Sequence, residues 1–241
     1  MKTRILEDRT AFNRACAEMV LGQMRAKKDA VIGLSTGRTT GDIHREIARL
    51  YKTAPFDISG LTFFEVDEVV NVPLTYSGAC YTMIHNELLD SIGVGDSQFV
   101  HFPTKSDDFA RDCAAVESEL ASRGGIDFIE LGLGENGHLA FNQPGSDFKG
   151  KAGLGAMYPE LEERIRRETA APSGLWLGGV GLGIADIMSA RKIMLAACGA
   201  SKASAVEKVL RGPVTEDVPG RIMQYHQDCE LILDKDAASK L

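Results

Sequence analysis

The chain has 241 residues, of which 44% are hydrophobic and 25% charged, and its formal net charge is −7. This length and balance predict one soluble globular domain, and the acidic balance argues against nucleic acid, whose phosphate backbone calls for clustered Lys and Arg. No apolar run reaches the ~18 residues of a membrane helix, and the N-terminus lacks the apolar core of a signal peptide. A small phosphorylated ligand stays compatible, because a few amides and one or two cations bind phosphate locally.

The cysteines are odd in number and scattered along the chain, and none belongs to a Cys-x-x-Cys pair. They are Cys16, Cys80, Cys113, Cys198 and Cys229. This usage predicts reduced thiols in a cytoplasmic protein and argues against a zinc site.

Seven apolar runs, mostly bounded by Gly or Asp, predict β-strands. They cover residues 30–35, 61–66, 99–102, 127–133, 175–177, 193–198 and 230–233. Continuous apolar runs of this kind are typical of parallel strands that are buried on both faces.

Segments with apolar residues at helical spacing lie between these runs and predict α-helices. They cover residues 8–24, 41–51, 79–89, 107–121 and 201–210. Because strands and helices alternate, we expect an α/β fold: a single domain over residues 1–241 with an open, mostly parallel sheet and helices on both faces, as in a Rossmann-like three-layer sandwich. Residues 149–172 form the least regular segment and are a candidate lid.

Ligands in open α/β sheets bind beyond the carboxyl ends of the strands, and three loops there are rich in polar residues or glycine. The first loop runs from Ser35 to Gly41 and combines hydroxyls with a glycine before a helix. The unpaired amides and the dipole of a helix N-terminus suit a phosphate. An ordinary capped turn explains this string equally well.

The second loop begins with two adjacent acids, Asp67 and Glu68, at the end of a predicted strand. Adjacent side chains of an extended chain diverge, so we expect one of the two to face a site. A carboxylate withdrawn from water gains basicity and suits proton abstraction beside a carbonyl. A solvated acidic turn is the simpler alternative.

The third loop, residues 132–145, contains four glycines and a single histidine, His138. Histidine titrates near neutrality and can move protons, and glycine lets the backbone approach a ligand closely. The glycine-dense setting favours a functional histidine over a structural one.

Together these loops resemble the glucosamine-6-phosphate deaminase (amino-sugar-phosphate isomerase) family. The resemblance is carried by LSTGRTT at 34–40, FFEVDEVVNVP at 63–73, GACYTMIH at 78–85, GLGENGHLAFNQPG at 132–145, GASKA at 199–203 and MQYH at 223–226. The order and spacing of these strings agree over most of the chain. The resemblance implies a sugar-phosphate enzyme that uses no metal and no organic cofactor.

The resemblance also implies roles for individual residues. The phosphate of the substrate would bind at Ser35, Thr36, Gly37, Arg38, Thr39 and Lys202. Asp67 matches the enolising base, and His138 matches the histidine that opens the sugar ring. Glu68, Tyr81 and Gly137 would line the substrate pocket.

Two positions depart from the family pattern. In the deaminases an Asp precedes the histidine by two residues and a Glu follows it by five, and these positions hold Asn136 and Gln143 here. Amides can keep the hydrogen bonds of this catalytic relay, but they stabilise an imidazolium far less than carboxylates do. The phosphate-binding arginine of the family has no clear counterpart among the arginines of residues 164–167.

The resemblance implies deamination of a hexosamine 6-phosphate to a ketose phosphate and ammonia. The two amides favour a galactosamine-type or another sugar phosphate as the substrate. A 6-phosphogluconolactonase-type hydrolase and a non-catalytic sugar-phosphate-binding protein are the alternatives. The expected partner is a small-molecule sugar phosphate, and both a monomer and a homo-oligomer fit the family.

Overall fold

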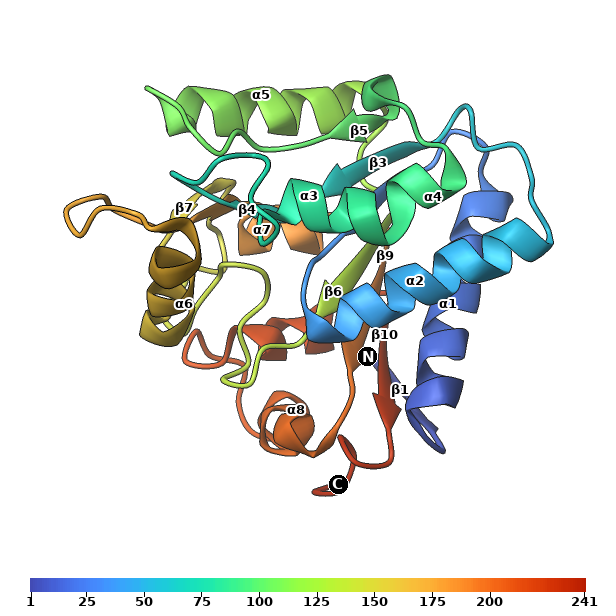
Figure 1. Ribbon diagram of the computed structural model, residues 1–241. Coiled ribbons are helices and arrows are strands. Elements are labelled where there is room, and N and C mark those ends of the chain that lie inside the picture. The colour runs from blue at the N-terminus through green and yellow to red at the C-terminus, as the bar shows by residue number, and fades with distance from the viewer.

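The computed structural model describes all 241 residues, and a seven-stranded sheet forms its centre (Figure 1). Its strands are β1 (Lys2–Leu6), β2 (Val31–Leu34), β3 (Thr62–Glu65), β5 (Phe99–Val100), β6 (Phe128–Gly132), β9 (Lys192–Ala197) and β10 (Cys229–Asp234). They lie in the order β1-β10-β9-β6-β2-β3-β5, and every neighbouring pair is parallel. The predicted open, parallel sheet is confirmed.

Helices cover both faces of the sheet, so the predicted three-layer arrangement is also confirmed (Figure 1). One face packs against α1 (Arg9–Ala26), α2 (Arg38–Thr53), α3 (Cys80–Ile84), the π-helix η1 (His85–Leu89) and α4 (Asp90–Ile92). The other face packs against α5 (Phe109–Ser122), α7 (Ile184–Met188), α8 (Ala203–Leu210) and the 3-10 helix η4 (Pro219–Tyr225). No helix is both long enough and apolar enough to cross a membrane.

Successive side chains of β9 enter the two helical layers in turn. Ile193 and Leu195 belong to the core under α5 and α8, whereas Met194 and Ala196 belong to the core under α1 and α2. Alternate residues of a strand point to opposite faces, so a strand covered on both faces must be apolar throughout. This is why continuous apolar runs predicted the central strands correctly.

A second, smaller sheet is absent from the sequence-based prediction. It is antiparallel, in the order β4-β8-β7, and consists of β4 (Asp67–Val69), β8 (Gly179–Gly181) and β7 (Gly153–Gly155). Helix α6 (Pro159–Thr169) packs beside it over a separate core that includes Val69, Met157 and Ile165. The candidate lid, residues 149–172, therefore contains β7 and α6, and its closure over a ligand stays a prediction.

One predicted strand and two predicted boundaries are wrong, and the edge strand β1 was not predicted. Residues 175–177 form no strand, because the strand that pairs with β4 lies at Gly179–Gly181. Helix α2 begins at Arg38, three residues before its predicted start, because Gly37 reverses the chain with a φ of 143°. Strand β5 is limited to Phe99–Val100 and does not reach residue 102.

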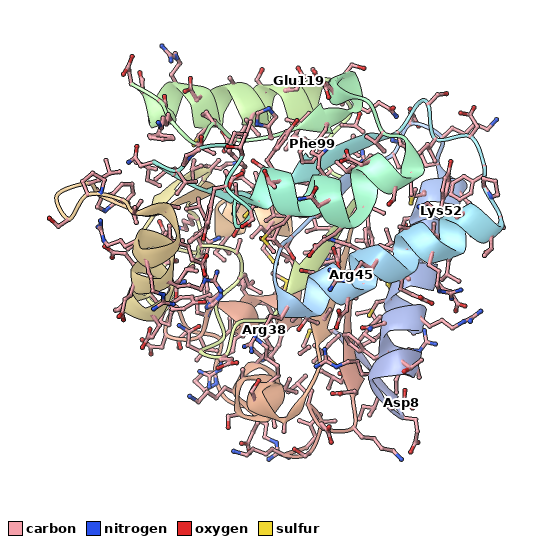
Figure 2. All side chains as sticks on the ribbon, in the orientation of Figure 1. Asp8, Arg38, Arg45, Lys52, Phe99 and Glu119 are labelled. Carbon is pink, nitrogen blue, oxygen red and sulfur yellow. The ribbon has the colours of Figure 1, made fainter.

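A chain of charged side chains runs from the surface of α2 into the sheet. His44 is fully buried, with Nε2 at 2.9 Å from Oε2 of Glu130 on β6 and Nδ1 at 3.2 Å from Oε2 of Glu87 on η1. Arg45 extends the chain to the surface through a 3.1 Å hydrogen bond to Glu87 (Figure 2). Burial alone lowers the pKa of His44, but the two carboxylates outweigh it and raise that pKa to about 9.

We expect His44→Leu to lower the free energy of unfolding by about 3–5 kcal/mol, because the change leaves two carboxylates without their buried partner. The double variant His44→Leu, Glu130→Leu should lose clearly less. The folded-state pKa of His44 lies above its ordinary value of 6.5, so its stabilisation is present below that pH and is lost as pH rises through about 9. Urea unfolding at about pH 6 and about pH 10 measures both effects. An equal loss in the single and double variants would contradict this account.

Candidate functional site

Asp67 and Glu68 begin β4, and their side chains diverge as predicted. The Glu68 carboxylate accepts hydrogen bonds from the backbone N–H groups of Cys80 at 2.7 Å and Tyr81 at 2.9 Å. Glu68 therefore holds the first turn of α3, because it satisfies amides that a helix start leaves unpaired. Its assignment to the substrate pocket stays a prediction.

Asp67 is 8% exposed, and no protein group donates a hydrogen bond to its carboxylate. Burial, together with the neighbouring Glu68 charge, raises the pKa of Asp67 to about 7. Neither oxygen of this carboxylate is engaged by a protein donor, and its basicity is close to what proton transfer at neutral pH requires.

His138 lies in the loop after β6, at the end of a hydrogen-bonded chain of amides. Its Nδ1 is 2.7 Å from Oδ1 of Asn136, and Nδ2 of Asn136 donates to Oε1 of Gln143 at 3.1 Å. The hydrogen-bonded relay that the family resemblance implies is therefore present with amides in place of the acids. Because the Asn136 oxygen can only accept, Nδ1 of His138 carries the proton and Nε2 keeps its lone pair.

The imidazole of His138 is neutral at physiological pH. Its pKa is lowered to about 4, mainly by burial and also by the charge of Lys202, while Glu135 opposes both. A carboxylate at position 136 would favour the imidazolium and raise the pKa of His138. The neutral amide of Asn136 does so much less, so burial remains the main influence on that pKa. The side chain can therefore accept a proton through Nε2 without first losing one.

The predicted phosphate loop joins three elements of the site. Ser35 Oγ accepts a hydrogen bond from the Gly132 N–H at 3.0 Å, which ties the end of β2 to the end of β6. Thr36 Oγ1 lies 3.0 Å from Sγ of Cys80 at the start of α3. No side chain caps α2, which begins after Gly37, so the amides of its first turn, including that of Thr39, face the loop without a side-chain acceptor.

Two cations stand beside this loop. Nζ of Lys202 donates to the Leu133 carbonyl at 2.7 Å, and burial lowers the pKa of this lysine. Arg38, at the N-terminal end of α2, is 91% exposed and has Nη2 at 3.4 Å from Oε1 of Glu135 (Figure 2). Glu135 therefore pairs with the Arg38 guanidinium, and a phosphate bound at this loop would compete with Glu135 for it.

Strand β8 links the His138 loop to the strand that carries Asp67. Asp67 pairs with Gly181 in the β4–β8 ladder, and a Cβ at position 181 would come within 2.6 Å of the Asp67 Cβ. The next residue, Leu182, accepts a 2.9 Å hydrogen bond from Nδ2 of Asn142 in the His138 loop. The two segments are thus joined through one strand, while the meeting of Asp67 and His138 over one substrate stays a prediction.

Residues 7–232 match the family model described as glucosamine-6-phosphate isomerases/6-phosphogluconolactonase. The chain belongs to this family. It is 31% identical to glucosamine-6-phosphate deaminase of Clostridium botulinum (strain Kyoto / Type A2) over 242 residues, which cover 100% of the chain and 99% of the relative. It is 29% identical to glucosamine-6-phosphate deaminase of Clostridioides difficile (strain 630), over 100% of the chain and 97% of the relative.

Solved structures of this family share the fold. A structure described as a monomeric glucosamine-6-phosphate deaminase has a TM-score of 0.92 at 27% identity, and the match covers 100% of both chains. The 6-phosphogluconolactonase from Trypanosoma brucei has a TM-score of 0.76 at 23% identity, over 100% of this chain and 98% of the other. At that identity the second likeness shows the fold alone.

The remaining predicted pocket residues of this family member have packing roles in the structure. A Cβ at Gly137, where φ is 88°, would lie 2.6 Å from Cγ1 of Val218, so only glycine fits the turn before His138. The Tyr81 ring packs against His85 at a centroid distance of 4.3 Å, with the two planes tilted by 32°, and also contacts Phe99 and His101. Their contact with substrate stays a prediction.

Two residues that bear on the site escaped the sequence-based prediction. Asn142 anchors the His138 loop through its bonds to Leu139 and Leu182, and the Tyr158 ring stacks against His138. Asn142 belongs to the AFNQPG string that carried the family resemblance, whereas Tyr158 lies twenty residues from His138 without a local signal.

Two cavities in the structure are not lined by the predicted catalytic pair. The smaller, of about 90 Å³, lies between residues 141–146 and β7 and β8, and the larger, of about 430 Å³, lies between α5 and α7. Neither has Asp67, His138 or Lys202 in its wall. No group of three or more His, Cys, Asp and Glu side chains is placed to hold a metal ion.

Proposed function

We propose that this family member is a hexosamine-6-phosphate deaminase, which converts an amino-sugar phosphate and water to a ketose phosphate and ammonia. The full-length match to curated deaminases supports the assignment. The structural observation that carries it is Asp67, a buried carboxylate with free oxygens and a pKa raised to about 7 by burial. Such a group suits removal of a proton bound to carbon beside a carbonyl.

In this proposal His138 catalyses the opening of the sugar ring. Its neutral imidazole presents Nε2, because Asn136 fixes the proton on Nδ1. Nε2 accepts the proton of the C1 hydroxyl and passes it to the ring oxygen while the bond between C1 and that oxygen breaks. The product is an open-chain aldehyde, and the imidazole returns to its starting state.

Asp67 then moves hydrogen between two carbons. Its carboxylate removes the C2 proton while the C1 oxygen gains one from solvent, which gives an enolamine. Asp67 returns its proton to C1 and the nitrogen releases one proton to solvent, which leaves an imine at C2. Water adds to that carbon and ammonia departs, so the balance is one water consumed and one ammonia released. A neutral sugar phosphate would undergo the same proton transfers and give only isomerisation.

The phosphate would bind where the amides of the first turn of α2 meet the hydroxyls of Ser35 and Thr36 and the Nζ of Lys202. The helix dipole and the lysine charge both favour an anion there. Arg38 adds a second cation at the mouth of this loop.

We expect Lys202→Met to raise KM about 10- to 100-fold with a smaller change in kcat, because a charge-assisted hydrogen bond to phosphate is worth roughly 1.5–3 kcal/mol. Inorganic phosphate should also become a weaker competitive inhibitor. Lys208→Met, on the exposed side of α8, is the matched control. An unchanged KM in Lys202→Met would remove this lysine from the phosphate site.

A substrate panel tests the proposed function. Glucosamine, galactosamine and mannosamine 6-phosphates would be assayed for ammonia, neutral hexose 6-phosphates for isomerisation, and 6-phosphogluconolactone for hydrolysis. We expect ammonia from a hexosamine 6-phosphate. Lactone hydrolysis without ammonia would reassign the chain to the hydrolase branch, and thermal stabilisation by the sugars without turnover would make it a binding protein.

The cellular compartment and the oligomeric state are also proposals. The five cysteines are buried and unpaired, which supports work in a reducing cytoplasm. One relative of solved structure is described as monomeric. Sedimentation would show whether this chain is a monomer or assembles into a homo-oligomer.

A further inference from the structure

The imidazole of His138 lies flat on its own loop. A Cβ built on Gly134 would be 2.3, 2.4 and 2.5 Å from the Nδ1, Cε1 and Cγ atoms of the ring. Nearly equal distances to three ring atoms mean that the glycine meets a face of the imidazole and not its edge. Any side chain at position 134 would therefore displace His138.

An aromatic ring from a distant segment stacks against the same imidazole. The Tyr158 ring has its centroid 6.0 Å from that of His138, with 29° between the two planes. With Asn136 bound to Nδ1, the Nε2 edge is the polar part of His138 left for a substrate.

Tyr158 is presented by a well-anchored helix. It directly precedes α6, which begins at Pro159 and is fixed by the buried side chains of Met157 and Ile165. Arg166 secures the other end of the helix with hydrogen bonds to the Pro172 and Leu175 carbonyls at 2.9 and 2.7 Å. These contacts fix the backbone from which the Tyr158 ring projects.

No protein group hydrogen-bonds the Tyr158 hydroxyl, and the residue is 39% exposed. The Tyr158 hydroxyl therefore contributes no hydrogen bond to the stability of the fold. Its one specific contact is the stack on His138.

We propose that Tyr158 is a positioning residue for the deamination reaction, whose ring covers His138 and excludes water from the imidazole, so that Nε2 faces the substrate and not solvent. This inference rests on the proposed function for its catalytic consequence. Its physical part, the covering of His138, is measurable without substrate.

Removal of the ring should rehydrate the imidazole. Burial is the main cause that lowers the pKa of His138 to about 4, and the charged groups that act on it are Lys202, which lowers it, and Glu135, which raises it. Tyr158→Ala leaves both charges in place, so any rise in the pKa reports the lost cover. Tyr158→Phe keeps the cover and removes only the hydroxyl.

The test is an NMR titration of the His138 ring in the full chain without ligand, assigned among the five histidines by a His138→Gln spectrum. We expect the pKa to rise by about one unit or more in Tyr158→Ala and Tyr158→Ser, because a solvated imidazole approaches its ordinary value. Tyr158→Phe and the exposed control Tyr225→Ala should match wild type. No difference between Tyr158→Ala and Tyr225→Ala would overturn the proposal.

Steady-state assays complete the test and separate it from the proposed function. We expect Tyr158→Ala to lower kcat at least fivefold with KM changed less, and Tyr158→Phe to restore kcat, since hydration of the ring interferes with proton transfer. A pKa rise with an unchanged kcat would overturn the catalytic role. An inactive wild type would refute the deaminase assignment while the NMR result still decides whether Tyr158 covers His138.

Discussion

Asp67→Asn should lower the rate of ammonia release about 10²- to 10⁴-fold, the range that a positioned general base contributes. Asparagine has nearly the same shape as aspartate but cannot take a proton from carbon. KM should change little, because the phosphate contacts lie on other residues. Ammonia release measured with saturating glucosamine 6-phosphate gives the comparison.

The surroundings of Asp67 explain why this carboxylate and not Glu68 is the expected base. Glu68 is tied to the amides of Cys80 and Tyr81, whereas Asp67 has no donor at all. The exposed Asp57→Asn is a matched control for loss of one charge. If Asp67→Asn kept activity within tenfold of wild type, another group would have to be the base.

The same carboxylate should make activity and stability respond to pH in opposite directions. Its folded pKa of about 7 lies above the ordinary 3.8, so ionisation between these values costs folding free energy. Wild-type kcat/KM should fall as pH drops below about 7, while stability falls as pH rises through that range. Asp67→Asn should therefore unfold at a higher temperature than wild type above pH 7, and a lower melting temperature there would contradict the burial argument.

The second large effect concerns the amide relay. Asn136→Asp should raise the pKa of His138 by about 1–3 units, because a carboxylate at 2.7 Å from Nδ1 favours the imidazolium. If the amides suppress ordinary deamination, ammonia release from glucosamine 6-phosphate should then rise roughly tenfold, because the carboxylate makes Nε2 a stronger base while the Tyr158 ring still keeps water from the imidazole, and one pKa unit corresponds to about a factor of ten in the protonation equilibrium. NMR titration and the ammonia assay measure the two parts separately.

Restoration of both acids, Asn136→Asp with Gln143→Glu, should also raise the rate. The side chains of these two residues are in contact at 3.1 Å, so two carboxyls there would share one proton and titrate as a pair. The exposed Gln227→Glu is the control for an added charge. A raised His138 pKa with an unchanged rate would show that the amides are not what limits deamination.

The central sheet was predictable except for its edge strand β1, because burial on both faces forces long apolar strands, as in β6 and β9, whereas β1 is mostly exposed. The small antiparallel sheet was not, because Gly153–Gly155 and Gly179–Gly181 carry almost no apolar signal. Their glycines are there for close approach: a Cβ at position 179 would come within 2.1 Å of the Phe141 ring. The apolar Leu175 and Trp176 drew the strand prediction four residues too early.

The part of the site that lies within one short stretch of sequence was predictable. The family resemblance implied a relay through Asn136, His138 and Gln143, and the structure contains these hydrogen bonds. Contacts between distant segments left no such pattern. The anchoring of α3 by Glu68 and the stacking of Tyr158 on His138 depend on how β4 and α6 fold back, which periodicity does not encode.

The account depends on Asp67 and His138 acting on one substrate whose phosphate lies on the loop of residues 35–39. A crystal structure with a reduced, open-chain 2-amino-hexitol 6-phosphate would test this directly. We predict the phosphate at Ser35, Thr36 and Lys202, with C2 within about 3.5 Å of an Asp67 oxygen and Nε2 of His138 facing the C1 and C5 hydroxyls. A ligand whose phosphate binds elsewhere, or whose C2 faces away from Asp67, would contradict the account.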